Sequence, residues 1–279
     1  MTNEAIAMRV PAMDAWYLRP QAAAPSGVAA LLALLGVAAP VEALLAGGIT
    51  VATRRVRACQ NLFHEGARAE AIHFVAVGTF KCLHVAEDGY EQVLGFNGRG
   101  EVLGYDAMFS GVHPTSVVAL EDSTVFALAP ADLTELCRRV PAFERALQRE
   151  LSRQLAQRVV IANLMAAVSA EVRLARFLVH LSDRMAENGQ SPRRMLLRMS
   201  RRDIASHIGV AHETVSRSFS ALAQWGCLAV CNREVEILDS ERLRACARST
   251  RGLTTDTPPT RGRPTLRAAQ LSDSSRCAA

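Results

Sequence analysis

The spacing of hydrophobic positions indicates β structure in the first half of the chain. Between about residues 49 and 129, short runs rich in Val, Ile and Phe are separated by recurring glycines, and Asp88-Gly89 stands between two of these runs. Runs of this length bounded by turn residues are typical of antiparallel strands joined by hairpins. We therefore predict an amino-terminal antiparallel β-roll, a small jelly roll.

After Pro141 the hydrophobic positions take on helical spacing. Residues 142–168 contain neither glycine nor proline, and their apolar side chains recur about every fourth position. This stripe predicts one long helix, and its length predicts packing against a second copy of the chain. We expect a homodimer through this helix, with the interface at Leu147, Leu151, Ile161, Met165 and Val168.

A third pattern occupies residues 201–222, RRDIASHIGVAHETVSRSFSAL. Ser200 and Asp203 have the spacing of a capping box, which marks the start of a short helix. Gly209 permits the backbone geometry of a tight turn, and Ala205 is small enough for two helices to cross closely. These features predict a helix-turn-helix, whose second helix enters the major groove of DNA.

The second helix has two different faces when about 100° is assigned to each residue. One face is apolar, and the other carries small polar groups and a Glu–Arg pair whose side chains can bond base edges. The predicted base-reading residues are His212, Glu213, Ser216 and Arg217, and the predicted phosphate contacts are Arg198, Arg201, Arg202 and Ser220. The alternative is that Glu213 and Arg217 form only a surface ion pair.

The patterns together predict an α+β chain that ends in a winged helix-turn-helix. Residues 227–230 and 234–239 form a short hairpin in this prediction, and the Thr, Pro, Ser and Arg of the final residues indicate disorder. The predicted parts are a variable extension over 1–39, the β-roll over 40–137, the dimerisation helix over 138–168, the winged helix-turn-helix over 169–248 and a disordered tail over 249–279.

Composition adds to this picture through the cationic residues. The 279-residue chain has a formal net charge of +5, and Lys81 is its single lysine. Arginine forms bidentate contacts with phosphate and guanine, which suits a double-stranded DNA partner. A base-composition bias in the genome accounts for the shortage of lysine equally well.

The cysteines and the apolar segment near the amino terminus argue against other classes of protein. Seven scattered cysteines without a CxxC pair predict neither a disulfide framework nor a structural metal site, so we expect a cytoplasmic protein. Residues 27–48 are apolar, but Pro40 leaves a run shorter than the ~20 residues that span a bilayer. We interpret this segment as a buried or self-associating extension that contacts no membrane.

The order of β-roll, long helix and winged helix-turn-helix resembles the CRP/FNR superfamily of bacterial transcription regulators over roughly residues 40–248. Residues 89–114 and 203–217 resemble the oxygen-sensing FNR branch in particular, and Glu213, Ser216 and Arg217 match its Glu-x-x-Ser-Arg pattern. The resemblance implies a β-roll like a cyclic-nucleotide-binding domain. It also implies a two-fold-symmetric DNA target with TTGAT-like half-sites, and RNA polymerase as a partner if the protein is an activator.

The chain departs from this family at the positions that hold cofactors and signals. Iron–sulfur members carry a cysteine cluster near the amino terminus and another cysteine in the β-roll, whereas residues 1–58 here contain none and Phe126 occupies the β-roll position. We expect no cofactor, and we interpret Cys59, Cys82 and Cys137 as small buried hydrophobes. The dimer helix also lacks the family's acidic residue, which predicts a dimer in air without a ligand.

Two other classes of protein share part of this predicted architecture. A cyclic-nucleotide-responsive regulator would need a Glu where the chain has Tyr105 and an Arg-Ser pair near Pro114-Thr115. A cupin-like metal-dependent enzyme would need a close His-x-His pair, which His64, His73, His84 and His113 do not form. The sequence therefore favours a DNA-binding regulator without catalytic or metal-binding residues.

Overall fold

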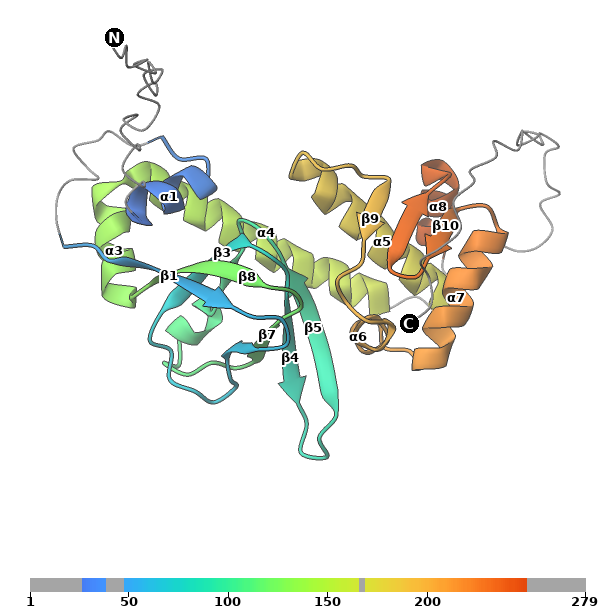
Figure 1. The fold of residues 1–279 in the computed structure, drawn as a ribbon, viewed down its shortest axis with the longest axis horizontal. Helices are drawn as coiled ribbons and strands as arrows, with labels where there is room; N and C mark the ends of the chain where they lie inside the picture. Colours follow the sequence, from blue (N-terminus) through green and yellow to red (C-terminus); the bar gives the residue numbers. More distant parts are fainter. Residues whose placement is uncertain (1–26, 39–47, 166–168, 250–279) are drawn as a thin grey trace, which may run out of the picture.

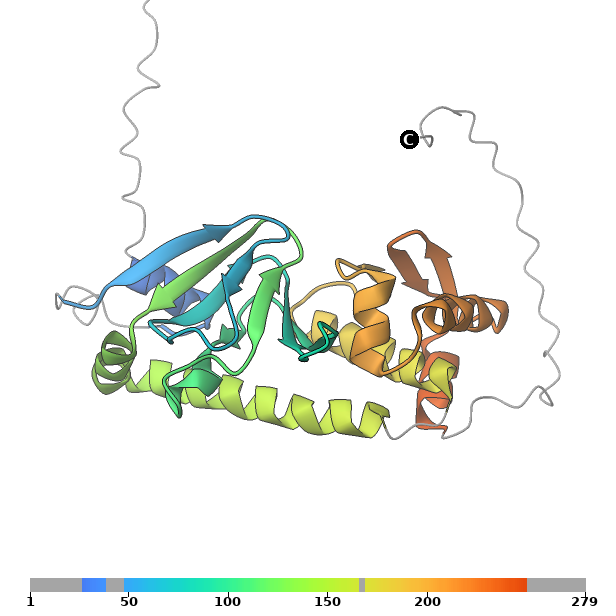
Figure 2. The same cartoon turned by 90° about the horizontal axis from the view of Figure 1, so that it is seen from below.

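Two units joined by one long helix make up the described chain. The structure is a computed structural model that describes residues 27–38, 48–165 and 169–249. Figure 1 shows a β-roll with strands β1 to β8 and a smaller unit with helices α5 to α8, and α4 (Pro141–Met165) reaches from one to the other. In Figure 2 the same helix runs beneath the β-roll. This arrangement confirms the predicted fold class.

The β-roll consists of two four-stranded antiparallel sheets, with strand orders β1-β8-β3-β6 and β2-β7-β4-β5. Val75 and Phe80, from different sheets, are fully buried in one hydrophobic cluster that the two sheets share. The Asp88-Gly89 pair forms the predicted turn between β4 and β5, where Gly89 has a φ of 81°. The strands are β1 (Val51–Val56), β2 (Asn61–Phe63), β3 (Ile72–Val77), β4 (Phe80–Val85), β5 (Glu91–Asn97), β6 (Val102–Leu103), β7 (Ser116–Ala119) and β8 (Ser123–Leu128).

A short helix from the expected extension belongs to the β-roll core. In α1 (Gly27–Leu34), Leu31 and Leu32 are buried in one hydrophobic cluster with residues of β3 and β8. Within the extension predicted over 1–39, α1 is therefore part of the β-roll unit. This burial accounts for the apolar residues of α1, and none of the described helices has the length and apolarity to cross a membrane.

Helix α4 packs some of the side chains predicted for the dimer interface against the β-roll. After α3 (Pro130–Arg139), Leu147 of α4 is only 4% exposed, and Leu151 packs against the same cluster. The predicted dimer contact at Leu147 thus needs correction, because its side chain is buried in the core of its own chain, whereas Leu151 is only partly buried there and its dimer contact stays a prediction. Met165 packs against the carboxy-terminal unit, and Val168 lies outside the described residues.

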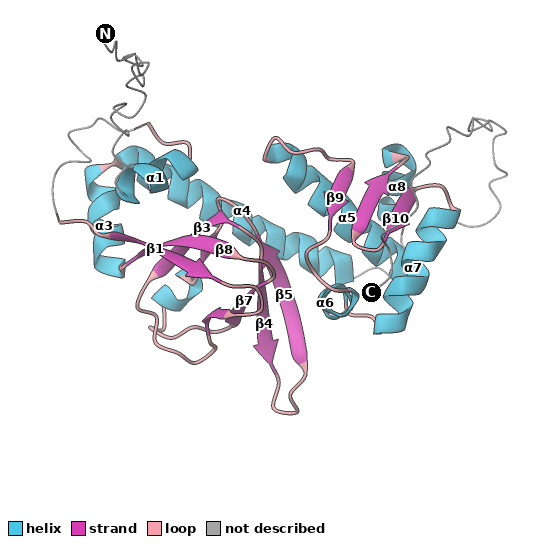
Figure 3. Cartoon of the chain, viewed as in Figure 1, coloured by secondary structure: helices cyan, strands magenta, loops and turns pink. Residues whose placement is uncertain are grey.

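The carboxy-terminal unit has the predicted winged helix-turn-helix order (Figure 3). Its wing is a three-stranded sheet in the order β10-β11-β9, so β9 adds a strand to the predicted hairpin. Of the disordered tail predicted over 249–279, Ser249 caps the end of α8, and residues 250–279 lie outside the described residues. The elements are α5 (Ala170–Glu187), β9 (Arg194–Leu196), α6 (Arg201–Ile208), α7 (His212–Gln224), β10 (Leu228–Cys231), β11 (Glu234–Ile237) and α8 (Ser240–Arg248).

Candidate nucleic-acid interface

The turn between α6 and α7 has the geometry that its sequence predicts. Ser200 caps α6 in a full capping box with Asp203, and Gly209 ends the helix with φ 64° and ψ 47°. The N–H of Val210 donates to the carbonyl of Ala205 at 3.0 Å, which closes the turn. A left-handed residue at a helix end is favourable for glycine, which has no Cβ to clash.

Arg173 of α5 completes this turn, and it is not among the residues that the sequence patterns predict for the site. Its guanidinium donates to the carbonyls of Ile208 at 3.1 Å and Gly209 at 2.9 Å, at the carboxy-terminal end of α6. A cation here satisfies free carbonyls and interacts favourably with the helix dipole. The sequence gives no local signal for the contact, because Arg173 lies 35 and 36 positions away from its partners.

Helix α7 exposes its polar face. Its apolar residues Val215, Phe219 and Leu222 are buried in the core of the unit. No ion pair joins Glu213 to Arg217 in the described chain, which differs from the alternative of a surface pair. The predicted reading residues His212, Glu213, Ser216 and Arg217 are all exposed on this helix, as is Ser220.

The predicted phosphate contacts have different surroundings. Arg202 is exposed and has no ion-pair partner among the described residues. Arg198 pairs with Glu121 of the β-roll at 3.1 Å. Arg201 is half-buried: its guanidinium lies 3.5 Å from the ring centroid of Phe219 and donates to the carbonyl of Asn232, so its phosphate contact stays a prediction. Its guanidinium stabilises the packing of α6, α7 and the wing, a role that helical spacing alone does not reveal.

Comparison with known proteins assigns this architecture to a family. Residues 172–246 match the Crp-like helix-turn-helix domain, and residues 53–140 match the cyclic nucleotide-binding domain. The fumarate and nitrate reduction regulatory proteins of Salmonella typhimurium and Escherichia coli K12 are each 34% identical over 194 residues, which cover 70% of this chain and 78% of the relative. The chain belongs to the CRP/FNR family of transcription regulators.

A solved structure supports the same assignment. The structure of FixK2 from Bradyrhizobium japonicum matches with a TM-score of 0.63 and 25% identity, over 74% of this chain and 99% of that one. The prediction of a DNA-binding regulator rather than an enzyme is confirmed, since the relatives are transcription regulators. The relatives therefore argue against the alternative of a cupin-like metal-dependent enzyme.

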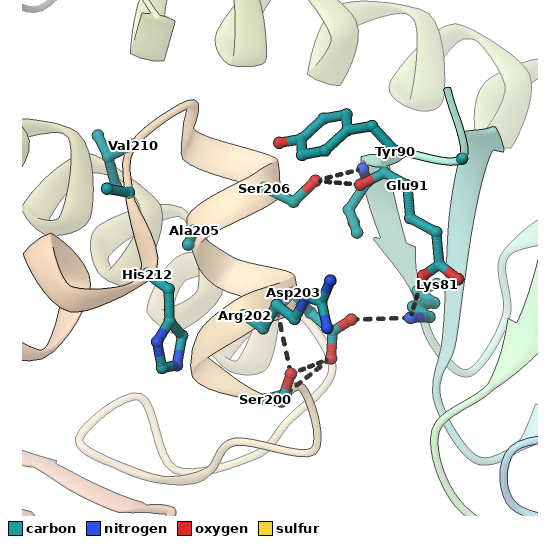
Figure 4. A pocket seen from close by; sticks show the side chains of 13 residues that line it. Lys81, Tyr90, Glu91, Ser200, Arg202, Asp203, Ala205, Ser206, Val210 and His212 are labelled. Carbon is teal, nitrogen blue, oxygen red and sulfur yellow. Dashed lines mark hydrogen bonds and ion pairs between the residues drawn. The ribbon is translucent and has the colours of Figure 1, made fainter. Parts of the chain in front are cut away.

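In this CRP/FNR regulator, α6 packs along the free edge of β5. The hydroxyl of Ser206 accepts from the N–H of Val93 and donates to the carbonyl of Glu91, both at 2.8 Å. Ser206 thereby bonds an edge strand as a neighbouring strand would. Lys81 of β4 adds an ion pair with Asp203 at 2.8 Å (Figure 4).

Burial and neighbouring charges determine whether Lys81 and Asp203 are ionised. Burial alone would lower the pKa of Lys81, but the hydrogen bond and charge of Asp203 raise it. Burial likewise opposes ionisation of Asp203, yet hydrogen bonds from Lys81 and Ser200 lower its pKa. Both groups are therefore charged at neutral pH. The single lysine of the chain thus pairs with the carboxylate that caps the first helix of the helix-turn-helix.

A polar pocket of about 590 Å³ opens between the β4–β5 hairpin and α6. Tyr90 and Glu91 line it from the β-roll, and Arg202 and His212 line it from the helix-turn-helix (Figure 4). The pocket therefore brings residues of the β-roll next to the start of the predicted reading helix.

The interior of the β-roll differs from the pattern of a cyclic-nucleotide site. Tyr105, which stands where the family's ribose-binding Glu is expected, packs partly buried against the hydrophobic core. Phe63 stacks on His113 with ring centroids 3.7 Å apart, and burial is the main cause that lowers the pKa of His73 to about 4. The two histidines are buried, and the described residues contain no group of three His, Cys, Asp or Glu side chains placed to hold a metal ion.

The cysteines only partly fit their predicted role. Cys82 is half-buried, and burial raises the pKa of its thiol to about 12, which agrees with an unreactive side chain. Cys137 is half-buried. Cys59 is exposed and has a φ of 64°, so the interpretation of Cys59 as a buried hydrophobe is wrong. It lies in the turn between β1 and β2, where a short apolar pattern does not distinguish strand from turn.

Proposed function

We propose that this regulator binds a palindromic, TTGAT-like DNA site as a homodimer and reads it with α7. The main support is the exposed polar face of that helix, where Arg217 can bond guanine, Glu213 can accept from cytosine and Ser216 can reach a base or a phosphate. His212 extends this face at the start of the helix. Since the target is chromosomal DNA, we place the protein in the cytoplasm and RNA polymerase among its partners if it activates transcription.

The dimer in this proposal uses the face of α4 that the β-roll leaves open. Leu155 and Val159 lie one helical turn apart on that face and are 66% and 60% exposed. Arg158, next to Val159, lies 3.8 Å from Asp106 of the 3-10 helix η1 (Tyr105–Met108), and Phe109 after it is 99% exposed. Apolar surface of this kind on a helix is typical of an interface.

Selection of bound DNA fragments followed by sequencing tests the predicted target. With that site, Arg217→Ala should cost about 1–3 kcal/mol of binding free energy and relax one position of the sequence preference. Arg202→Ala should weaken binding to all sequences alike and reduce the salt dependence. If Arg217→Ala left both affinity and preference intact, α7 would not be the reading helix.

The match of residues 53–140 to the cyclic nucleotide-binding domain supports a second candidate, a regulator that responds to a cyclic nucleotide. Tyr105 and the absence of an Arg-Ser pair near Pro114-Thr115 argue against it. Calorimetric titration with cyclic AMP distinguishes the two, because we expect no binding in the micromolar range.

A further inference from the structure

Glu101 is a buried carboxylate at the junction of the two units, and its side chain contacts three elements. It is 3% exposed, and its Oε1 accepts from Arg153 of α4 at 2.8 Å and from Arg184 of α5. Its Oε2 accepts from the N–H of Gly98 at 3.1 Å, and Arg184 also donates to the carbonyl of Phe96 at 2.9 Å. One carboxylate thus joins the β-roll, the long helix and the DNA-binding unit.

A buried ionic cluster of this kind favours one arrangement of the elements that supply its members. If α5 moved away, the buried carboxylate of Glu101 would keep Arg153 but lose Arg184, and removal of one partner from a buried ion pair is strongly unfavourable. Arg153 also bonds Glu150, so α4 keeps its own part of the cluster. The network therefore opposes separation of the β-roll from the DNA-binding unit.

The β5–α6 contact fixes the same two units at a second place. Val93 and Phe96 of β5 are buried within the hydrophobic core of the DNA-binding unit. His207 of α6 packs against Phe96 with ring centroids 5.1 Å apart. With the two hydrogen bonds of Ser206, this contact sets the position of α6 and, through the tight turn, that of α7.

The docked arrangement leaves the reading face of α7 uncovered. Glu213, Ser216 and Arg217 are exposed while Ser206 and Glu101 make their contacts. The contact therefore differs from an autoinhibitory one, in which the β-roll would cover the residues that meet DNA.

We propose that Glu101 and Ser206 are positioning residues for DNA recognition, which hold the helix-turn-helix on the β-roll in its DNA-ready orientation. This inference rests on the proposed reading of DNA by α7. Two recognition helices that meet half-sites about 34 Å apart must be presented at a fixed separation. A rigid contact within each chain removes orientational freedom that binding would otherwise have to remove.

Two variants of the full-length protein separate this role from general stability. Glu101→Gln keeps the shape and an acceptor for Gly98 but removes the charge that pairs with Arg184. Ser206→Ala favours the helix and removes both bonds to β5. The matched control is Asp183→Asn, which removes a carboxylate from an exposed pair with Arg244 inside the DNA-binding unit.

Hydrogen exchange and calorimetry measure the contact without DNA. The amide of Val93 donates to Ser206, so peptides over 91–97 should exchange faster in both variants and at the wild-type rate in the control. The wild type should unfold in one calorimetric transition, and Glu101→Gln should split it into two. Unchanged exchange over 91–97 together with a single transition would overturn the proposal.

Affinity for the selected palindrome gives the functional result. Both variants should bind about tenfold more weakly, within the 5–150-fold range typical of coupling between sites, and the control should match the wild type. Tighter binding by either variant would overturn the proposal, since the contact would then be inhibitory. A wild type that binds no DNA would contradict the proposed function alone, because hydrogen exchange of residues 91–97 measures the contact between β5 and α6 without DNA.

Discussion

At the scale of single residues, His207 connects the two units through an apolar environment. It is 5% exposed and lies edge-on to Phe96 and Phe177. Burial is the main cause that lowers its pKa to about 4, and the nearby charges of His180 and Arg184 lower it further. The ring is therefore neutral at pH 7, and its neutral form is the one that stabilises the contact.

This shift predicts an acid-sensitive fold. The unfolded chain, with a His pKa of about 6.5, binds more protons than the folded chain between pH 6.5 and 4. The contribution of His207 to the free energy of unfolding is thus complete above pH 6.5 and is lost as the pH falls toward 4, by on the order of 3 kcal/mol. Urea unfolding at several pH values should show a smaller loss for His207→Gln. An equal pH slope in both proteins would contradict the assignment.

At the scale of elements, the turn between α6 and α7 depends on Gly209. An added Cβ would lie 3.0 Å from the sulfur of Met165 and 3.3 Å from Arg173, at a φ of 64°. The left-handed backbone alone costs a side chain about 1–2 kcal/mol. Gly209→Ala should therefore lower the melting temperature, which circular dichroism measures.

Gly226→Ala is the control for this substitution. Gly226 has a φ of 72°, but its nearest atom to an added Cβ is a guanidinium nitrogen of Arg242 at 4.0 Å. The Gly226→Ala variant should lose only the stability that the left-handed backbone costs. It should therefore melt at a higher temperature than the Gly209→Ala variant. Equal losses would show that Met165 and Arg173 move aside without cost.

Helix ends that depend on local signals could be predicted from the sequence. Which side of a helix is buried could not, because that depends on contacts with residues far away in the chain. Ser200, Asp203 and Gly209 specify the start and end of α6 within a few residues, and the structure has both. The stripe on α4 predicts a helix, but the same spacing fits packing on the β-roll and packing on a partner. Leu147 is buried and Leu155 is exposed because the β-roll covers only one side of α4.

At the scale of the whole molecule, the open face of α4 governs assembly. The stretch between Glu150 and Glu171 contains no Asp or Glu, so no carboxylates there oppose each other across a two-fold axis. Burial of Leu155 and Val159 against a second copy is favourable by ~25 cal/mol for each Å² of apolar surface removed from water. Charged Arg158 can extend its long side chain toward solvent and Asp106.

We therefore expect a dimer at low micromolar concentration in air, in the absence of ligand, and equally without oxygen. Leu155→Asp should give a monomer in sedimentation experiments, because it would bury two like charges at the axis, and binding to the palindrome should fall with it. Val77→Asp makes the same kind of change at a β-roll residue that is 57% exposed, and it should leave the dimer intact. A wild type that is monomeric in air and dimeric only without oxygen would contradict the prediction. A dimeric Leu155→Asp would instead move the interface to another face, with exposed Phe109 the next position to test.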